Sequence, residues 1–145
     1  MINVFSSGLS DLLVLFSIPY FIELRFEAST QARLLPEDPY SGSYAFWSNK
    51  GDESDMTLTR EFDFTQVSAP ITFSFHTWYD IEKDYDYVYL EISEDGEHWQ
   101  IVTTPSGTDE DPSGNSYGWG YNNVTNGWIQ EDVDLSDLVK LTEAF

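Results

Sequence analysis

Two alternating segments on either side of an acidic bend place the strongest constraint on how this chain folds. Residues 71–79 and 85–93 alternate in polarity, with Ile71, Phe73 and Phe75 on one face of the first segment and Val88, Leu90 and Ile92 on one face of the second. Successive side chains of a β-strand point to opposite faces, so each segment is predicted to be a strand with one face in the core. The bend between them holds four carboxylates within seven positions, Asp80 to Asp86. The sequence therefore predicts the centre of a β-sheet with negative charge concentrated at one end.

The composition extends this prediction to the whole chain. The 145 residues are 41% hydrophobic and 17% aromatic, enough for one domain with a core despite a net charge of −20. Trp, Tyr and Phe favour half-buried pleated surfaces. Residues 56–64 and 127–135 also read as strands, and Asp95-Gly96 indicates a tight hairpin turn. We therefore predict an all-β fold, a jelly-roll sandwich of about eight strands.

The charge excludes several classes of partner. The six Lys and Arg residues are scattered along the chain, whereas nucleic acids and anionic membranes are bound by clusters of cations. We expect neither partner. A high negative charge keeps a secreted or halotolerant protein soluble. The absence of cysteine excludes disulfides and fits a bacterial or archaeal protein.

The first 21 residues do not fit the strand pattern. Residues 12–22 are apolar, but Pro19 interrupts them and they are too short for a membrane helix of about 20 residues. Asp11 stands where a signal peptide would carry Lys or Arg. We expect residues 1–21 to be a linker or the tail of a preceding region. Residues 22–145 are expected to form one sandwich domain, with 22–27 as its first strand.

The acidic bend allows two explanations. Carboxylates this close together need either full solvation or a cation, and calcium takes several oxygen ligands of this kind. Asp86 shares the inward face of Val88 and Leu90, so it needs either a cation or Arg60 as a partner. Residues 52–55 form a second acidic turn. If both turns lie at one end of the sandwich, they could build a single oxygen-rich site.

The sequence contains no strong catalytic motif. It has no His-Glu-x-x-His zinc helix, no phosphate loop and no Gly-x-Ser-x-Gly elbow, and His76 and His98 fall on separate predicted strands. No zinc site is expected. Paired carboxylates would allow a glycosidase. A carbohydrate-binding module would instead use aromatic stacking platforms, with Trp47, Trp78, Trp119 or Trp128 as the candidates.

Five short segments occur in an order that resembles a known domain. They are 40–52 (YSGSYAFWSNKGD), 57–60 (TLTR), 78–82 (WYDIE), 84–89 (DYDYVY) and 93–96 (SEDG) followed by Trp99. Over residues 40–135 this series resembles the MAM-like, galactose-binding-like jelly-roll domain of the immune inhibitor A family of secreted bacterial metallopeptidases.

The resemblance implies a non-catalytic accessory domain downstream of a zinc protease domain. Its partners would be the protease catalytic domain or a protein substrate, whereas the alternative carbohydrate-binding module would bind glycans. The resemblance also supports a structural calcium site with ligands among Asp52, Asp55, Glu82, Asp84 and Asp86. The family pattern continues through a further core strand after Ser136, whereas this sequence ends at Phe145. We therefore expect a sandwich truncated at its C-terminal end.

Overall fold

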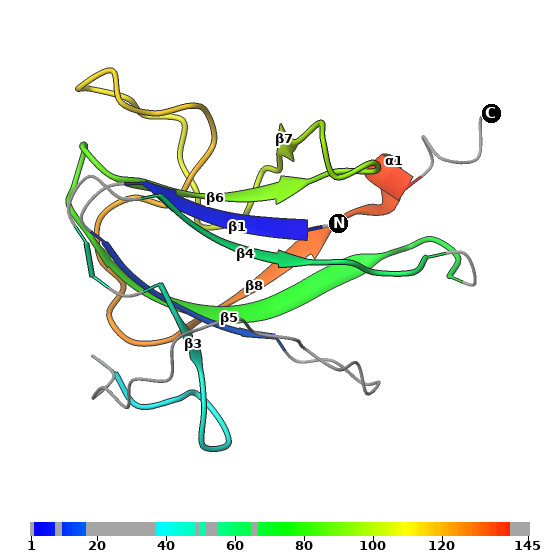
Figure 1. Ribbon diagram of the computed structural model, residues 1–145, viewed down its shortest axis with the longest axis horizontal. Helices are drawn as coiled ribbons and strands as arrows, with labels where there is room; N and C mark the ends of the chain where they lie inside the picture. Colours follow the sequence, from blue (N-terminus) through cyan, green and yellow to red (C-terminus); the bar gives the residue numbers. More distant parts are fainter. Residues whose placement is uncertain are drawn as a thin grey trace.

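The chain folds into two antiparallel sheets of four strands each, packed face to face (Figure 1). The computed structural model describes residues 2–7, 10–16, 37–48, 50–51, 55–64 and 67–139. The first sheet has the order β4-β1-β6-β7 and the second β3-β2-β5-β8. The elements are β1 (Ile2–Ser7), β2 (Ser10–Phe16), β3 (Phe46–Trp47), β4 (Asp55–Arg60), β5 (Thr72–Ile81), β6 (Tyr87–Ile92), β7 (Gln100–Ile101), β8 (Ile129–Asp134) and α1 (Ser136–Val139). The prediction of an all-β fold is confirmed. Among the described residues, no helix is long and apolar enough to cross a membrane.

The core lies between the sheets, where the alternating residues of β5 and β6 meet. Phe75 of β5 is 2% exposed and Val88 of β6 is fully buried. Each belongs to one apolar cluster that also includes Val133 of β8 and Leu135 beyond it. Both predicted strands are present, but they do not form the centre of one sheet, because β5 is an inner strand of the second sheet and β6 of the first. The bend between them is residues 82–86, since β5 continues to Ile81 and β6 begins at Tyr87.

The N-terminal segment is part of the sandwich rather than a linker. Strand β1 pairs with both β4 and β6, and β2 pairs with both β3 and β5. The expectation of a linker was wrong for residues 2–7 and 10–16. The apolar run in this segment lacks the period of two by which a half-exposed strand is recognised, so the pattern did not mark it as β. Pro19 and the predicted strand at 22–27 lie outside the described residues.

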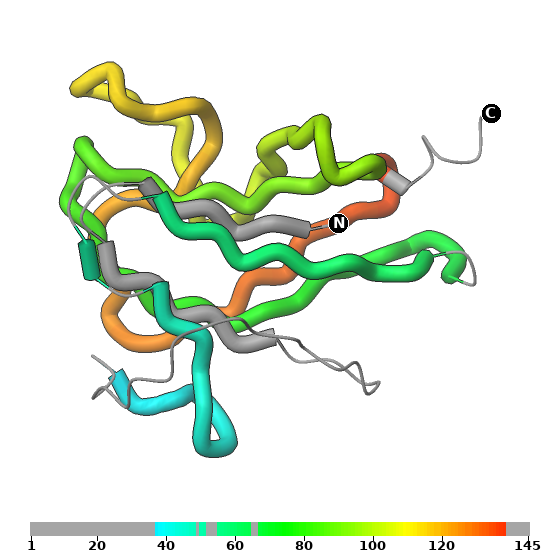
Figure 2. The backbone as a smooth tube through the Cα atoms, viewed as in Figure 1, coloured from blue at the N-terminus to red at the C-terminus, as the bar shows by residue number. Residues whose placement is uncertain are grey.

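The outer face of β6 is covered by the loop of residues 105–120, which lies over the start of the strand (Figure 2). Tyr87 and Tyr89 point to this face, yet both are fully buried. The Tyr87 hydroxyl donates to the carbonyl of Glu110 at 3.1 Å. The backbone N–H of Tyr117 donates to the Tyr89 hydroxyl at 2.9 Å. Strand β6 therefore packs on both of its faces, and the loop forms a third layer.

A buried carboxylate lies beside two buried tyrosines inside the sandwich. Glu131 of β8 is fully buried, and one of its oxygens accepts a bond from the N–H of Ser106 at 3.3 Å. Burial, and then the charge of Glu131, raise the pKa of Tyr79 to about 12. Burial also raises the pKa of Tyr121, whose ring centroid lies 5.4 Å from that of Tyr79.

Stability should therefore fall in alkali, and Tyr79→Phe should reduce that fall. The folded pKa of Tyr79 exceeds the unfolded value of about 10, so its contribution is complete below pH 10 and is lost as the pH rises towards 12. At about pH 11 the loss from this residue is about 1.4 kcal/mol. Urea unfolding of the unmodified chain and of Tyr79→Phe, at about pH 8.5 and pH 11, measures this loss of unfolding free energy. Tyr85→Phe, which alters an exposed ring, should keep the full alkaline loss; an equal loss in Tyr79→Phe would contradict the assignment.

Candidate functional site

The acidic bend between β5 and β6 is held in shape by the loop that follows later in the chain. The carbonyl of Glu82 accepts bonds from the N–H groups of Tyr85 and Asp86 at 3.2 and 3.0 Å. Asp84 has a φ of 68°, a left-handed conformation that Asp and Asn adopt more readily than other non-glycine residues. The Asn122 side chain accepts from the Asp84 N–H at 3.2 Å and donates to the Asp86 carbonyl at 2.9 Å. The hydroxyl of Ser113 donates to the carbonyl of Asp84.

Acidic residues from the bend and the loop converge on the Tyr87 phenol. Burial raises the pKa of Tyr87, and the nearby charges of Asp111, Asp84 and Glu110 raise it further. Asp111 is fixed because one of its oxygens accepts from the N–H groups of Asn115 and Ser116 at 2.8 and 3.1 Å. Glu110 and Asp111 belong to the segment 105–115, whose sequence gives no sign of a site. The abundance of Asp, Gly and Pro there was a signal of a turn, not of a site.

The second acidic turn lies at the same end of the first sheet. Asp55 at the start of β4 is paired with Ser7 of β1, and Ser7 is paired with Tyr87 of β6. Two strand spacings separate Asp55 from Tyr87, about 10 Å between backbones. Directly paired residues share a face, so Asp55 lies on the outer face with Tyr87.

The predicted ligands do not all lie on that face. Asp55 and Glu82 are exposed, whereas Asp86 is 8% exposed and lies on the inner face with Val88. Asp84 is half-buried, and Asp52 lies outside the described residues. Among the residues that the structure describes, no group of three or more His, Cys, Asp or Glu side chains is arranged to hold a metal ion.

The alternative of an ion pair between Asp86 and Arg60 is wrong. Arg60 is paired with Ile2, which is paired with Ile92 at the far end of β6 from Asp86. Six residue steps along the chain separate Asp86 from Ile92, about 20 Å. The Arg60 guanidinium instead lies 4.7 Å from the centre of the Phe62 ring, and burial lowers its pKa.

The candidate platform tryptophans are half-buried. Trp47 and Trp78 lie in one row across the second sheet, since both are paired with Leu13 of β2. The Trp128 indole donates to the carbonyl of Asp38 at 2.8 Å, and that of Trp119 donates to the carbonyl of Thr104 at 3.0 Å. Both of these rings therefore have structural partners.

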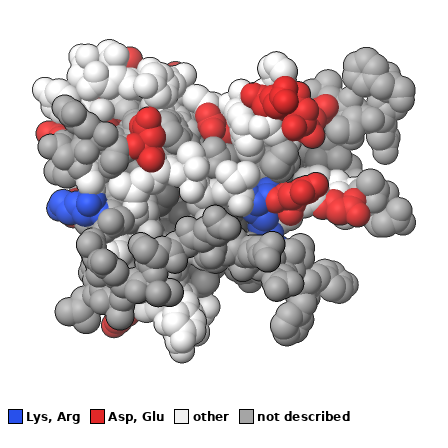
Figure 3. Space-filling view, viewed as in Figure 1, with Lys and Arg blue, Asp and Glu red and all other residues white. Residues whose placement is uncertain are grey.

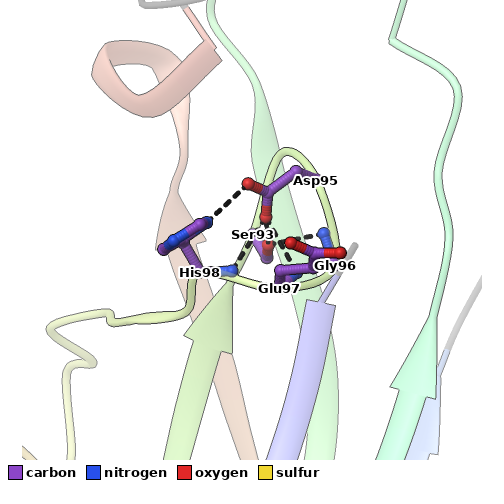
Figure 4. Close-up of polar contacts among 5 residues, drawn as sticks. All are labelled: Ser93, Asp95, Gly96, Glu97 and His98. Atoms are coloured by element: carbon purple, nitrogen blue, oxygen red, sulfur yellow. Dashed lines mark hydrogen bonds and ion pairs between the residues drawn. The ribbon is translucent and has the colours of Figure 1, made fainter.

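A serine, an aspartate and a histidine meet in the turn between β6 and β7 (Figure 4). Asp95 accepts from the N–H groups of Glu97 and His98 at 2.8 Å and from the Ser93 hydroxyl at 3.1 Å. Its second oxygen lies 2.7 Å from Nδ1 of His98. These bonds, led by the N–H of His98, hold the pKa of Asp95 well below its usual range. A catalytic triad needs the hydroxyl bonded to the imidazole. Here the hydroxyl bonds to the carboxylate, so the arrangement closes the turn between β6 and β7. The prediction of a tight hairpin turn was wrong, because residues 93–99 separate the two strands and only Gly96 of the Asp95-Gly96 pair has a positive φ.

The comparison with protein families agrees with the resemblance in the sequence. The model of the immune inhibitor A-like MAM domain matches residues 19–141. This chain belongs to the immune inhibitor A-like MAM domain family. Strands β1 and β2 precede the matched region of this MAM domain.

Two curated relatives of this MAM domain are proteases. Both are the pre-pro-metalloprotease PrtV, from the M66-2 and El Tor Inaba N16961 strains of Vibrio cholerae serotype O1. Each is 29% identical over 98 residues, which are 68% of this chain and 10% of the relative. The chain thus spans only a small part of the length of these relatives. No solved structure matches it significantly.

Proposed function

We propose that this chain is a non-catalytic accessory domain of a secreted immune inhibitor A-like zinc metallopeptidase. It stabilises or positions the catalytic domain or its protein substrate. The observation that carries the proposal is the family match over residues 19–141, together with the similarity to a metalloprotease over only 10% of that protein's length. The sequence contains no His-Glu-x-x-His motif, so zinc and peptide cleavage would belong to another part of such a protein.

The polar clusters of the described residues support a structural rather than a catalytic role. The Asp95 carboxylate accepts from the Ser93 hydroxyl and from the N–H groups of Glu97 and His98, an arrangement that closes a turn. The acids around Tyr87 lie where the loop of residues 105–120 is attached to the sheet. Charge at such a junction affects whether the loop stays on the sheet.

A structural calcium ion is the second part of the proposal. Asp84, Glu110 and Asp111 act on one phenol, and Asp55 lies on the same face two strands away. Carboxylate and carbonyl oxygens of this kind suit calcium, which would neutralise the repulsion between bend and loop. Asp52 and Glu82 would complete the shell from the two turns, and Asp86 would support the bend from the inner face.

Calcium should therefore raise the melting temperature of the chain. Extracellular sites have dissociation constants of about 0.1 to 1 mM, so calcium at about 5 mM would add about 1 to 2 kcal/mol. For a domain of this size that is a rise of about 3 to 8 °C. Thermal unfolding followed by circular dichroism, with calcium, with magnesium or with EDTA, measures the shift.

Two variants make this test specific. Asp84→Asn should abolish most of the calcium shift, while Glu97→Gln, at the other end of β6, should leave it unchanged. Because a cation favours the phenolate, calcium should also lower the pKa of Tyr87. Equal melting temperatures in calcium and in EDTA would remove the metal from the proposal while leaving the accessory role standing.

A further inference from the structure

A pocket of about 320 Å³ lies at the opposite end of β6 from the acidic bend. It is formed by the turn of residues 93–99, the start of β7 and the short helix α1. Its size is within the range of small-ligand sites, and it suits one long side chain. None of the residues assigned to the calcium site lines it.

The lining of the pocket combines an apolar surface with acidic groups. Ile92, Trp99 and Leu138 are half-buried, while Glu94, Asp95 and Gln100 are exposed. An aliphatic stem can therefore lie against the first three side chains while a polar head meets the others. An indole face also attracts a cation, because the ring carries negative charge density on its face.

The charge of the pocket favours a cation over an anion. The four hydrogen bonds and ion contacts of Asp95 hold its carboxyl in the charged form. Glu94 adds a second carboxylate that is exposed to solvent. Figure 3 shows acidic side chains gathered over this turn. The net charge of −20 extends the attraction for cations beyond the pocket itself.

We infer that this pocket receives the side chain of a lysine or arginine from a protein partner. The stem of that side chain lies on Ile92, Trp99 and Leu138, and its cationic head lies beside Glu94 and Asp95. This inference takes from the proposed function only the expectation that the partner is a protein. The pocket, its apolar surface and its charge are independent of calcium and of the protease.

The test uses the intact chain and a minimal cationic ligand. Nα-acetyl-L-arginine amide is titrated at about pH 8 and low salt, and the indole N–H signal of Trp99 is followed by NMR. The expected dissociation constant is on the order of 1 mM, since one side chain supplies little contact area. Nα-acetyl-L-norleucine amide, which has the stem without the charge, should bind at least about 5-fold more weakly, equivalent to about 1 kcal/mol.

Two variants of the same turn provide a matched pair. Glu94→Gln and Glu97→Gln each remove one negative charge, but only Glu94 lines the pocket. Glu94→Gln should weaken binding about 3-fold to 10-fold, and Glu97→Gln less than 2-fold, with unchanged melting temperatures. If both variants weakened binding equally, the net charge of the chain and not the pocket would explain the binding, and the inference would be overturned. Equal binding of the norleucine ligand, or a Trp99 signal that does not move, would also overturn it. The titration is repeated in EDTA, where binding to the pocket should be unchanged because the pocket does not depend on calcium. Failure of the pocket proposal can therefore be told apart from failure of the calcium proposal.

Discussion

Val14→Pro is expected to unfold the sandwich. Val14 lies within β2, paired with Phe46 of β3 on one side and with Thr77 of β5 on the other. In a strand paired on both edges, every N–H faces a partner, and proline has no N–H to donate. The cost is about 3 kcal/mol or more, against a total stability of about 5 to 15 kcal/mol for a domain. Urea unfolding followed by tryptophan fluorescence should show a large fall in midpoint or no folded baseline.

The matched control is Val14→Ile, which keeps both the N–H and the β-branched shape. It should shift stability by no more than about 1 kcal/mol. If residues 10–16 were a linker, Val14→Pro would leave the stability of the domain unchanged, because a linker has no strand hydrogen bonds to lose. An unchanged midpoint in Val14→Pro would therefore restore the linker and contradict the central position of β2.

Gly107→Ala is expected to detach the loop of residues 105–120 from the sheet. A Cβ atom at this position would lie 2.3 Å from Nε1 and 2.6 Å from Cδ1 of Trp119, and 2.7 Å from Oγ1 of Thr104. The indole cannot move away without losing its hydrogen bond to the Thr104 carbonyl. Overpacking together with the lost bond should cost about 2 to 4 kcal/mol. Urea unfolding gives the loss, and proteolysis at residues 105–118 should become faster.

Gly114→Ala is the control within the same loop. A Cβ atom there meets nothing within 4 Å, although its φ of 76° makes alanine strained. The expected cost is about 1 kcal/mol, from the backbone alone. If the two variants lost equal stability, backbone strain rather than the contact with Trp119 would explain Gly107.

The strands that could be predicted are those that show two different faces. In β5, Phe73 and Phe75 alternate with the more exposed Thr72 and Ser74, so the period of two reveals the strand. Strands β1 and β2 have no comparable period, and their pairing depends on partners more than 30 residues away in sequence, such as Leu13 with Trp47 and Trp78 to either side. The sandwich was predictable, but the segment that links both of its sheets was not.

The candidate site was likewise predictable only in part. Asp84 stood out because it lies in a local run of acids, whereas Asp111 comes 27 positions later and reaches Tyr87 only through the folding of its loop. The alternation of apolar residues correctly predicted that Asp86 faces the core. It could not give the distance along the strand to Arg60, which depends on the register between β4, β1 and β6.

The most direct test of the accessory role is a domain exchange in the related metalloprotease PrtV. Three enzymes are compared: the intact protease, one lacking the segment that matches this chain, and one in which this chain replaces that segment. Each is assayed for kcat/KM on a folded protein and on a short peptide, with the peptide reporting that the catalytic domain is folded. We predict that deletion lowers cleavage of the folded protein at least about 10-fold more than cleavage of the peptide, a difference of about 1.4 kcal/mol, and that this chain restores it. Equal cleavage of the folded protein with and without the domain, or hydrolysis of the peptide by this chain alone, would contradict the account.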